Sequence, residues 1–299
     1  MSRKNRAHLD FLRQDFAQRG SMLAVAPTLI NIGLGTSGLQ KTTNNSYEIG
    51  HRPLLRGKYL EEPILLVENS KNDGDFVQQI FFVLRKTHPV KEYSFTARHG
   101  GGSTIVHCFD EEIVQKRVVV CLIDSDKLSP GHVDSATLKS LVRVSMLGSF
   151  IGDIFVTKCR EIENHLPANL IQQHNICPDY KEFELLFKFT NKSDTEDSAN
   201  PWLYFDIKDG ISGKVFLSKA HASSTREWVR TAFSQPGGSF DDLNLPGFGP
   251  NIMRQFLDSG PAMRDFKTHM LSPYWGNVFG GVFEQMLWYF ASDKRRSTI

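Results

Sequence analysis

The fold is decided by the stretch Pro63-Ile64-Leu65-Leu66-Val67-Glu68-Asn69-Ser70, in which four apolar residues lead directly into a glutamate. A second stretch has the same form, because Val118-Val119-Val120-Cys121-Leu122-Ile123 is followed by Asp124-Ser125-Asp126. Continuous apolar runs rich in β-branched residues are typical of strands buried on both faces of a parallel sheet. Ligands of such sheets bind outside the carboxyl ends of the strands, so we expect these acids to lie at a functional edge.

The region around these two runs alternates between strand and helix patterns. Apolar spacing predicts helices over 75–86, 105–113 and 135–147, and further strands over 93–97 and 153–159. This β-α-β-α-β-α-β order implies an α/β fold, a parallel sheet with helices on its faces. We therefore predict a sheet domain over 61–192, an N-terminal extension over 1–60 and a mixed, mostly helical region over 193–299. The polar, acidic stretch 191–200 is the predicted boundary loop.

The N-terminal extension contains an amphipathic helix pattern over 8–19 and a glycine motif of the form G-x-G-x-x-G. The glycines are Gly33, Gly35 and Gly38, and they follow a strand-like run. A dinucleotide-binding fingerprint also needs a helix that opens at the third glycine, and the polar residues after Gly38 do not predict one. Lys41 and Thr42 are displaced from the positions of a phosphate-binding P-loop. We therefore interpret the motif as a glycine-rich loop.

Composition and charge limit the classes of protein to consider. The 299 residues are 40% hydrophobic and 23% charged, with a formal net charge of +2, which is ordinary for a globular protein. Basic clusters at 2–6 and 294–296 are interpreted as solvated termini. No cysteine pair has C-x-x-C spacing, so free thiols are expected rather than a zinc site or disulfides. No apolar run approaches the roughly 20 residues of a membrane span, and no signal peptide is evident, so we expect a cytoplasmic protein without a membrane segment.

The strand-end acids predict a metal site. Carboxylates that lie close together repel one another and resist ionisation unless a cation pairs with them. Mg²⁺ or Mn²⁺ would do so, because Mg²⁺ prefers carboxylate oxygens together with water and substrate phosphate. In Asp124-Ser125-Asp126, alternate residues face the same way if the strand continues through them. The alternative is that these acids are simply solvated, and Glu68 at the end of a second strand argues against it.

The same residues resemble the motifs of Toprim domains, the fold shared by topoisomerases, bacterial primases and several nucleases. Val67-Glu68-Asn69 resembles the Val-Glu-Gly of the family, with Asp73 and Phe76 after it, and Gly101-Gly102-Ser103 resembles its glycine turn. Asp124-Ser125-Asp126 matches its D-x-D. Arg160-Glu161-Ile162-Glu163-Asn164-His165-Leu166 resembles a stretch of the OLD-type and stand-alone Toprim nucleases of bacterial anti-phage defence. The sequence departs from the family at Asn69 and by one residue inserted before Asp73.

The resemblance implies a metal-dependent nuclease that cuts phosphodiester bonds of DNA or RNA. Asp124 and Asp126 would hold a metal ion, Glu68 would be a further ligand or a general acid/base, and Glu163 with Asp73 would complete a second metal site. Two ions can stabilise both the attacking and the leaving oxygen. A lysine would offset negative charge at the phosphate. Lys208 is the first candidate, and Lys127 and Lys158 are the others.

Three matters stay open from the sequence. Glu163 is either a ligand or a residue that caps a helix start, and Asn164 is expected to orient a neighbour. The implied partners are nucleic acid, a separate ABC-type ATPase that controls the nuclease, and a second copy of the chain. The alternative functions are strand transfer of the primase or topoisomerase kind, and a non-catalytic subunit that binds nucleic acid or a protein partner.

Overall fold

The computed structural model of the chain describes residues 25–35, 37–43, 46–190, 200–220, 222–234 and 239–292. The helix predicted over 8–19, the basic clusters at both termini and most of the loop predicted over 191–200 lie outside these residues. Within them, no helix has both the length and the apolar character that crossing a membrane requires.

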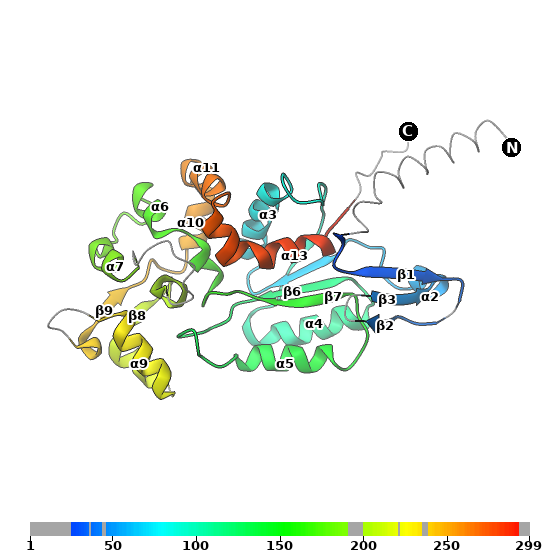
Figure 1. The fold of residues 1–299 in the computed structure, drawn as a ribbon, viewed down its shortest axis with the longest axis horizontal. Helices are drawn as coiled ribbons and strands as arrows, with labels where there is room; N and C mark the ends of the chain where they lie inside the picture. Colours follow the sequence, from blue (N-terminus) through cyan, green and yellow to red (C-terminus); the bar gives the residue numbers. More distant parts are fainter. Residues whose placement is uncertain are drawn as a thin grey trace.

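A four-stranded parallel sheet forms the centre of the molecule (Figure 1). Its strands are β4 (Ile64–Val67), β5 (Thr96–His99), β6 (Val119–Ile123) and β7 (Gly152–Val156), arranged in the order β5-β4-β6-β7. All three pairings are parallel, and Leu66 lies opposite Arg98 on one side and Cys121 on the other. The predicted α/β class and parallel sheet are therefore confirmed.

Helices cover both faces of this sheet, because alternate residues of each strand point to opposite sides. Leu65 and Val67 face α3 (Asn72–Leu84) and α13 (Gly281–Tyr289), whereas Ile64 and Leu66 face α4 (Ile105–Val114) and α5 (Ala136–Ser145) (Figure 1). All four strand residues are at most 1% exposed. Full burial of each such side chain contributes about 1.5–3 kcal/mol, so the apolar run that predicts β4 is also what anchors it between the two layers.

Two strands differ in extent from their predictions. β5 begins at Thr96 rather than at residue 93, because the preceding segment is held by the end of the chain: Ser94 N–H donates to the Phe290 carbonyl at 3.0 Å, and Phe95 packs against the Phe290 ring. β7 ends at Val156 rather than at residue 159, because Thr157 Oγ1 donates to the Cys159 carbonyl at 2.7 Å and turns the backbone out of the sheet.

The described part of the N-terminal extension forms a small sheet of its own. Strands β1 (Leu29–Gly33), β2 (Gln40–Thr43) and β3 (Ser46–Gly50) are arranged in the order β1-β3-β2, followed by the short helix α2 (His51–Arg56). Strand β2, not a helix, follows Gly38. The interpretation of the glycine motif as a loop rather than a dinucleotide-binding turn is therefore confirmed.

The region after the sheet is mostly helical, as predicted. The elements are η2 (Ile162–His165), α6 (Ala168–Gln173), α7 (Phe183–Thr190), η3 (Pro201–Tyr204), β8 (Gly210–Ser212), α8 (Gly213–Lys219), α9 (Ser223–Ala232), η4 (Phe240–Asp242), β9 (Asn244–Pro246), α10 (Ile252–Asp258), α11 (Gly260–His269), α12 (Pro273–Trp275), η5 (Gly276–Gly280) and α13. Helices α10 and α11 lie beside α3 (Figure 1). Phe283, Met286 and Leu287 of α13 are fully buried and belong to the core.

Candidate metal centre

The acids predicted from the sequence gather where the parallel strands end. Glu68 directly follows β4, Asp124 directly follows β6, and Glu163 lies in η2, just beyond β7. The charges of Glu163, Glu68 and Asp73 all act on Asp124 and help to raise its pKa. The structure therefore brings together side chains that are distant in sequence, at the edge where sheets of this kind bind ligands.

Glu163 is paired with Lys208, which enters the site from the segment after η3. Lys208 Nζ lies 3.2 Å from Glu163 Oε1, and only 6% of the glutamate side chain is exposed. Burial alone would lower the pKa of Lys208, but the charges of Glu163, Glu161 and Asp124 raise it above its ordinary value. The ammonium group is therefore held in its charged form. The other carboxylate oxygen, Glu163 Oε2, is buried and has no hydrogen-bond partner among the described residues.

Asp124 is held in place from the turn after β7. Its Oδ1 accepts a hydrogen bond from the Ile162 backbone N–H at 2.8 Å. Burial is the largest cause that raises the pKa of Asp124 well above its usual value, followed by the charges of Glu163 and Glu68. A carboxyl group that is both buried and surrounded by like charges favours its neutral form unless a cation is close.

Asp126 corrects one expectation. The sequence placed both carboxylates of Asp124-Ser125-Asp126 on the same side on the condition that the strand continues through them. Instead β6 ends at Ile123, and Asp126 is exposed and adopts the left-handed conformation, with φ 55°. Its N–H donates to the Arg160 carbonyl at 3.0 Å, which fixes this turn. Asp126 still lies close enough to Glu68 for its charge to raise the pKa of that residue, second only to burial.

Asp73 lies at the start of α3, where Asn69 determines its surroundings. Asp73 Oδ2 accepts the Asn69 N–H at 2.8 Å, and Asn69 Oδ1 accepts the N–H groups of Lys71 and Asn72, both at 3.2 Å. Asn69, which stands where the motif it resembles has glycine, thus holds two backbone N–H groups just before α3. Asp73 is 8% exposed, and burial, opposed by the Asn69 hydrogen bond, raises its pKa to about 7. One of its oxygens is committed to the backbone, and its charge reaches Glu163.

Asn164 connects the turn that carries Glu163 to the segment that carries Lys208. Its Oδ1 accepts the Glu161 N–H at 2.7 Å, and its Nδ2 donates to the carbonyls of Trp202 and Phe205 at 2.6 and 2.9 Å. Glu161 and Asn164 together form the capping box of η2, so this role does not fall to Glu163. The orienting role predicted for Asn164 is confirmed. With Trp202 Nε1 donating to the Asn164 carbonyl at 2.8 Å, three hydrogen bonds at this one buried residue join the two segments.

Glu161 and the pair of Arg160 and Asp206 belong to the site and were not assigned roles from the sequence. Burial raises the pKa of Glu161 to about 7, and its Oε2 is buried without a hydrogen-bond partner among the described residues. Arg160 and Asp206 form an ion pair with side chains only 12% and 11% exposed. The sequence could have pointed to Glu161, because it stands two residues before Glu163 in the segment between β7 and η2. No sequence signal indicates that Asp206 pairs with Arg160.

The other candidate cations lie elsewhere. Lys127 Nζ is 3.5 Å from Asp134, and Lys158 Nζ donates to the Asn277 carbonyl at 3.3 Å, whereas Lys208 lies among the acids. The glycine turn after β5 is adjacent to Glu68, because the Gly101 N–H donates to the Glu68 carbonyl at 3.3 Å. Gly101 and Gly102 have φ angles of 59° and 52°, which glycine adopts without strain, so the sharp turn predicted here is confirmed.

Whether the residues present suit a metal ion can be judged from their chemistry. Among the residues that the structure describes, no three His, Cys, Asp or Glu side chains already stand together as a group that could hold an ion. The donors are nevertheless carboxylate oxygens, which hard divalent cations prefer. Two of these oxygens, on Glu161 and Glu163, are buried without partners, and a buried polar atom left in this way is costly. Glu68, Asp124 and Glu163 are the residues that would hold a cation.

The residues that resemble Toprim motifs thus meet in space. Glu68, the glycine turn, Asp124 and Glu163-Asn164 lie at the carboxyl ends of four adjacent strands or just beyond them. No family model matches the chain, and neither a curated protein nor a solved structure is significantly similar to it. The resemblance to Toprim nucleases therefore rests on these motif residues alone.

Proposed function

We propose that the chain is a Mg²⁺- or Mn²⁺-dependent nuclease that hydrolyses phosphodiester bonds of DNA or RNA. The observation that carries this proposal is the set of acids at one edge of the parallel sheet, with Lys208 paired to Glu163 among them. Structural acids are normally matched one to one by cations. Here Lys208 interacts electrostatically with five acids, namely Glu68, Asp73, Asp124, Glu161 and Glu163.

Each residue has a place in the proposed chemistry. A bound divalent cation would supply charge stabilisation at the phosphate and activate water. Glu68, Asp124 and Glu163 would hold that cation, and the exposed Asp126 and the buried Asp73 would add further negative charge near it. Lys208 offsets the negative charge that develops on the phosphate oxygens. Glu68 has a raised pKa at the edge of the cluster and is suited to move a proton, as a general acid or base.

The partners in the proposal are nucleic acid and an ABC-type ATPase that controls cutting in an anti-phage defence system. The ATPase and the defence setting rest on the resemblance to OLD-type and stand-alone Toprim nucleases. They agree with the absence of a P-loop in the described residues, where the glycine motif leads into a strand. A cytoplasmic location and self-association belong to the same proposal.

The test is a cleavage assay that compares charge-neutral variants of the acids. Wild-type protein is incubated with plasmid DNA, single-stranded DNA and tRNA in Mg²⁺ or Mn²⁺, and again in EDTA. Cleavage that requires metal and falls at least about 100-fold in Glu68→Gln and Asp124→Asn supports the proposal. Asp242→Asn, an exposed acid on η4, is the matched control and should cut like wild type.

Two outcomes separate the alternative functions. Metal-dependent strand joining or primer synthesis in place of hydrolysis would assign the site to strand transfer. Binding of nucleic acid with no binding of Mn²⁺ by wild type would assign the chain to a non-catalytic subunit, which the lack of a preassembled metal group would then explain.

A further inference from the structure

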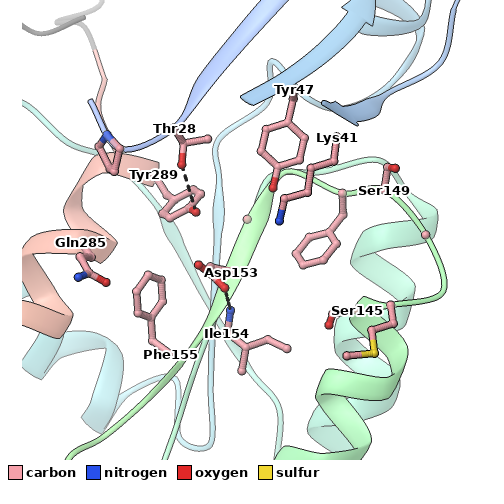
Figure 2. A pocket seen from close by; sticks show the side chains of 15 residues that line it. Thr28, Lys41, Tyr47, Ser145, Ser149, Asp153, Ile154, Phe155, Gln285 and Tyr289 are labelled. Atoms are coloured by element: carbon pink, nitrogen blue, oxygen red, sulfur yellow. Dashed lines mark hydrogen bonds between the residues drawn. The ribbon is translucent and has the colours of Figure 1, made fainter. Parts of the chain in front are cut away.

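A pocket lies at the amino end of β7, whereas the acids lie beyond the carboxyl ends of the strands. It is a cavity of about 510 Å³ between the N-terminal sheet and the amino end of β7, and the end of α5 and one side of α13 close it (Figure 2). Its volume is within the range of clefts that bind small molecules. Nothing in the proposed nuclease chemistry uses this pocket.

Two opposite charges face each other across the pocket without pairing. Lys41 comes from β2 and Asp153 from β7, and both side chains are exposed. Neither forms an ion pair with another residue in the part of the chain that the structure describes. Asp153 Oδ1 accepts the adjacent Ile154 N–H at 2.8 Å, the Asp153 carboxylate is also hydrogen-bonded to the Tyr289 hydroxyl, and Lys41 Nζ lies 5.9 Å from the centre of the Tyr47 ring. A ligand that enters the pocket therefore meets an anion and a cation on different walls.

Hydroxyl groups and aromatic rings complete the lining. Figure 2 shows the hydroxyls of Tyr47 and Tyr289, the Lys41 amine and the Asp153 carboxylate directed toward the middle of the pocket. Tyr47 is 4% exposed, and the Tyr289 hydroxyl lies 3.5 Å from Thr28 Oγ1, so both tyrosines have fixed positions. Phe155 adds an apolar surface on β7.

We infer that this pocket binds a nucleoside monophosphate, either free or as one nucleotide of a strand. The partly exposed ring of Tyr289 suits the flat face of a base, because every base presents a π-surface. Asp153 can accept hydrogen bonds from base N–H groups, Lys41 can bind the phosphate, and the tyrosine hydroxyls can bind the sugar or the base edge. The inference does not depend on the metal centre.

Simpler ligands match the lining less well. A small amine would pair with Asp153 and leave Lys41 unused, and inorganic phosphate would do the reverse. A free amino acid could satisfy both charges, but it would fill only a small part of the cavity. A nucleotide offers a phosphate to Lys41, base N–H donors to Asp153 and a flat ring to Tyr289, and its size suits the cavity.

The test is isothermal titration calorimetry on the full-length protein in EDTA, so that metal-dependent cleavage cannot interfere. The probes are AMP, GMP, CMP and UMP, then guanosine, inorganic phosphate and a five-nucleotide single strand. Lys41→Met and Asp153→Asn are compared with Lys139→Met and Asp110→Asn, which remove exposed charges on α5 and α4. All four changes are at exposed positions, and thermal melting confirms that each variant is folded.

The expected result is saturable binding of at least one mononucleotide by wild type and by both control variants. Lys41→Met should weaken binding of the nucleotide at least tenfold but leave binding of guanosine unchanged. Asp153→Asn should weaken binding of both. Tighter binding of the oligonucleotide than of any mononucleotide identifies a strand as the source of the ligand, and the reverse identifies a free nucleotide. No saturable binding of any mononucleotide or of the strand up to about 5 mM, or equal binding by all variants, overturns the inference. If the wild-type protein binds a nucleotide but cuts no nucleic acid in Mg²⁺ or Mn²⁺, only the proposed function is overturned.

Discussion

Lys208 Nζ lies 3.2 Å from Oε1 of Glu163, so a lysine from beyond η3 supplies the cation for a glutamate in the turn after β7. The same ammonium group also offsets the charges of Glu68, Asp73 and Asp124. Arg160, which pairs with Asp206, also offsets Asp126 and Glu161, so two cations among the described residues stand against a larger number of acids. This imbalance predicts how the protein responds to mutation, to pH and to divalent metal.

Replacement of Lys208 should reduce both stability and cleavage. In Lys208→Met the Glu163 charge loses its partner, and we expect the free energy of unfolding in EDTA to fall by about 1–2 kcal/mol at pH 8. This is less than for a fully buried pair because about a third of the lysine side chain is exposed. Cleavage should fall about 100-fold. Guanidinium denaturation and the plasmid assay measure the two effects.

Lys158→Met is the matched control for this variant. Lys158 is exposed, and its amine contacts only a backbone carbonyl, that of Asn277. It should leave stability and cleavage close to wild type. A larger loss of cleavage in Lys158→Met than in Lys208→Met would show that the wrong lysine has been assigned to the phosphate.

Removal of one acid should stabilise the metal-free protein while it destroys function. Glu68→Gln relieves the repulsion with Asp126 that, after burial, raises the pKa of Glu68. We expect a gain of about 0.5–1 kcal/mol in EDTA, a trade of activity for stability that is common at functional sites. Thermal melting in EDTA and in Mg²⁺ measures it. Lower stability of Glu68→Gln in EDTA would mean that Glu68 serves the fold and not a cation.

The metal-free protein should be more stable in mild acid than in mild base. The pKa of Asp73 is raised from about 4 in the unfolded chain to about 7 in the folded one, mainly by burial. The folded state therefore holds this proton when the unfolded state has lost it, so stability is greatest below pH 4 for this group and declines as the pH rises to about 7. We expect a loss of about 2 kcal/mol between pH 5 and pH 8 in EDTA.

Denaturation across this pH range, with and without Mg²⁺, tests the effect. Asp73→Asn should reduce the slope of the metal-free profile without abolishing it, because Asp73 no longer titrates but Glu161, whose pKa is also raised to about 7, still does. Saturating Mg²⁺ should flatten it in wild type, because a cation favours the ionised acids. A wild-type profile that rises from pH 5 to pH 8 in EDTA would contradict the account.

Asn164 should act as a positioning residue for Glu163 and Lys208. Asn164→Ala removes the amide donor from the buried Trp202 and Phe205 carbonyls, of which Trp202 keeps the Phe205 N–H at 3.4 Å, and we expect a loss of about 2–4 kcal/mol of stability. At a temperature where the variant is folded, the maximal rate of cleavage should fall by a larger factor than the apparent affinity for the substrate. Asn169→Ala, at an exposed position of α6, is the control and should change neither.

The sheet could be predicted because its central strands carry their own signal. Ile64–Val67 and Val119–Ile123 are buried on both faces, so every residue in them is apolar. β5 could not be delimited, because its amino-terminal side is held by Phe290 and not by local pattern. Strand ends set by a partner far along the chain leave no trace in the periodicity of the strand itself.

The site was predictable in its acids but not in its geometry. Glu68, Asp124 and Glu163 stand out because they directly follow strands or lie in the turn beyond one. The turn at Asp126 depends on a hydrogen bond to Arg160, and the approach of Lys208 to Glu163 depends on Asn164 joining two segments. These are contacts between residues far apart in sequence, and no spacing rule indicates them.

The most direct test of the central claim is an anomalous diffraction map from crystals of the full chain soaked in Mn²⁺. The account predicts a manganese peak at the carboxyl edge of the parallel sheet, bound by carboxylate oxygens of at least two of Glu68, Asp124 and Glu163, and lost in crystals of Asp124→Asn. Crystals saturated with Mn²⁺ that show no peak among these residues, and in which Lys208 stays paired with Glu163, would contradict it.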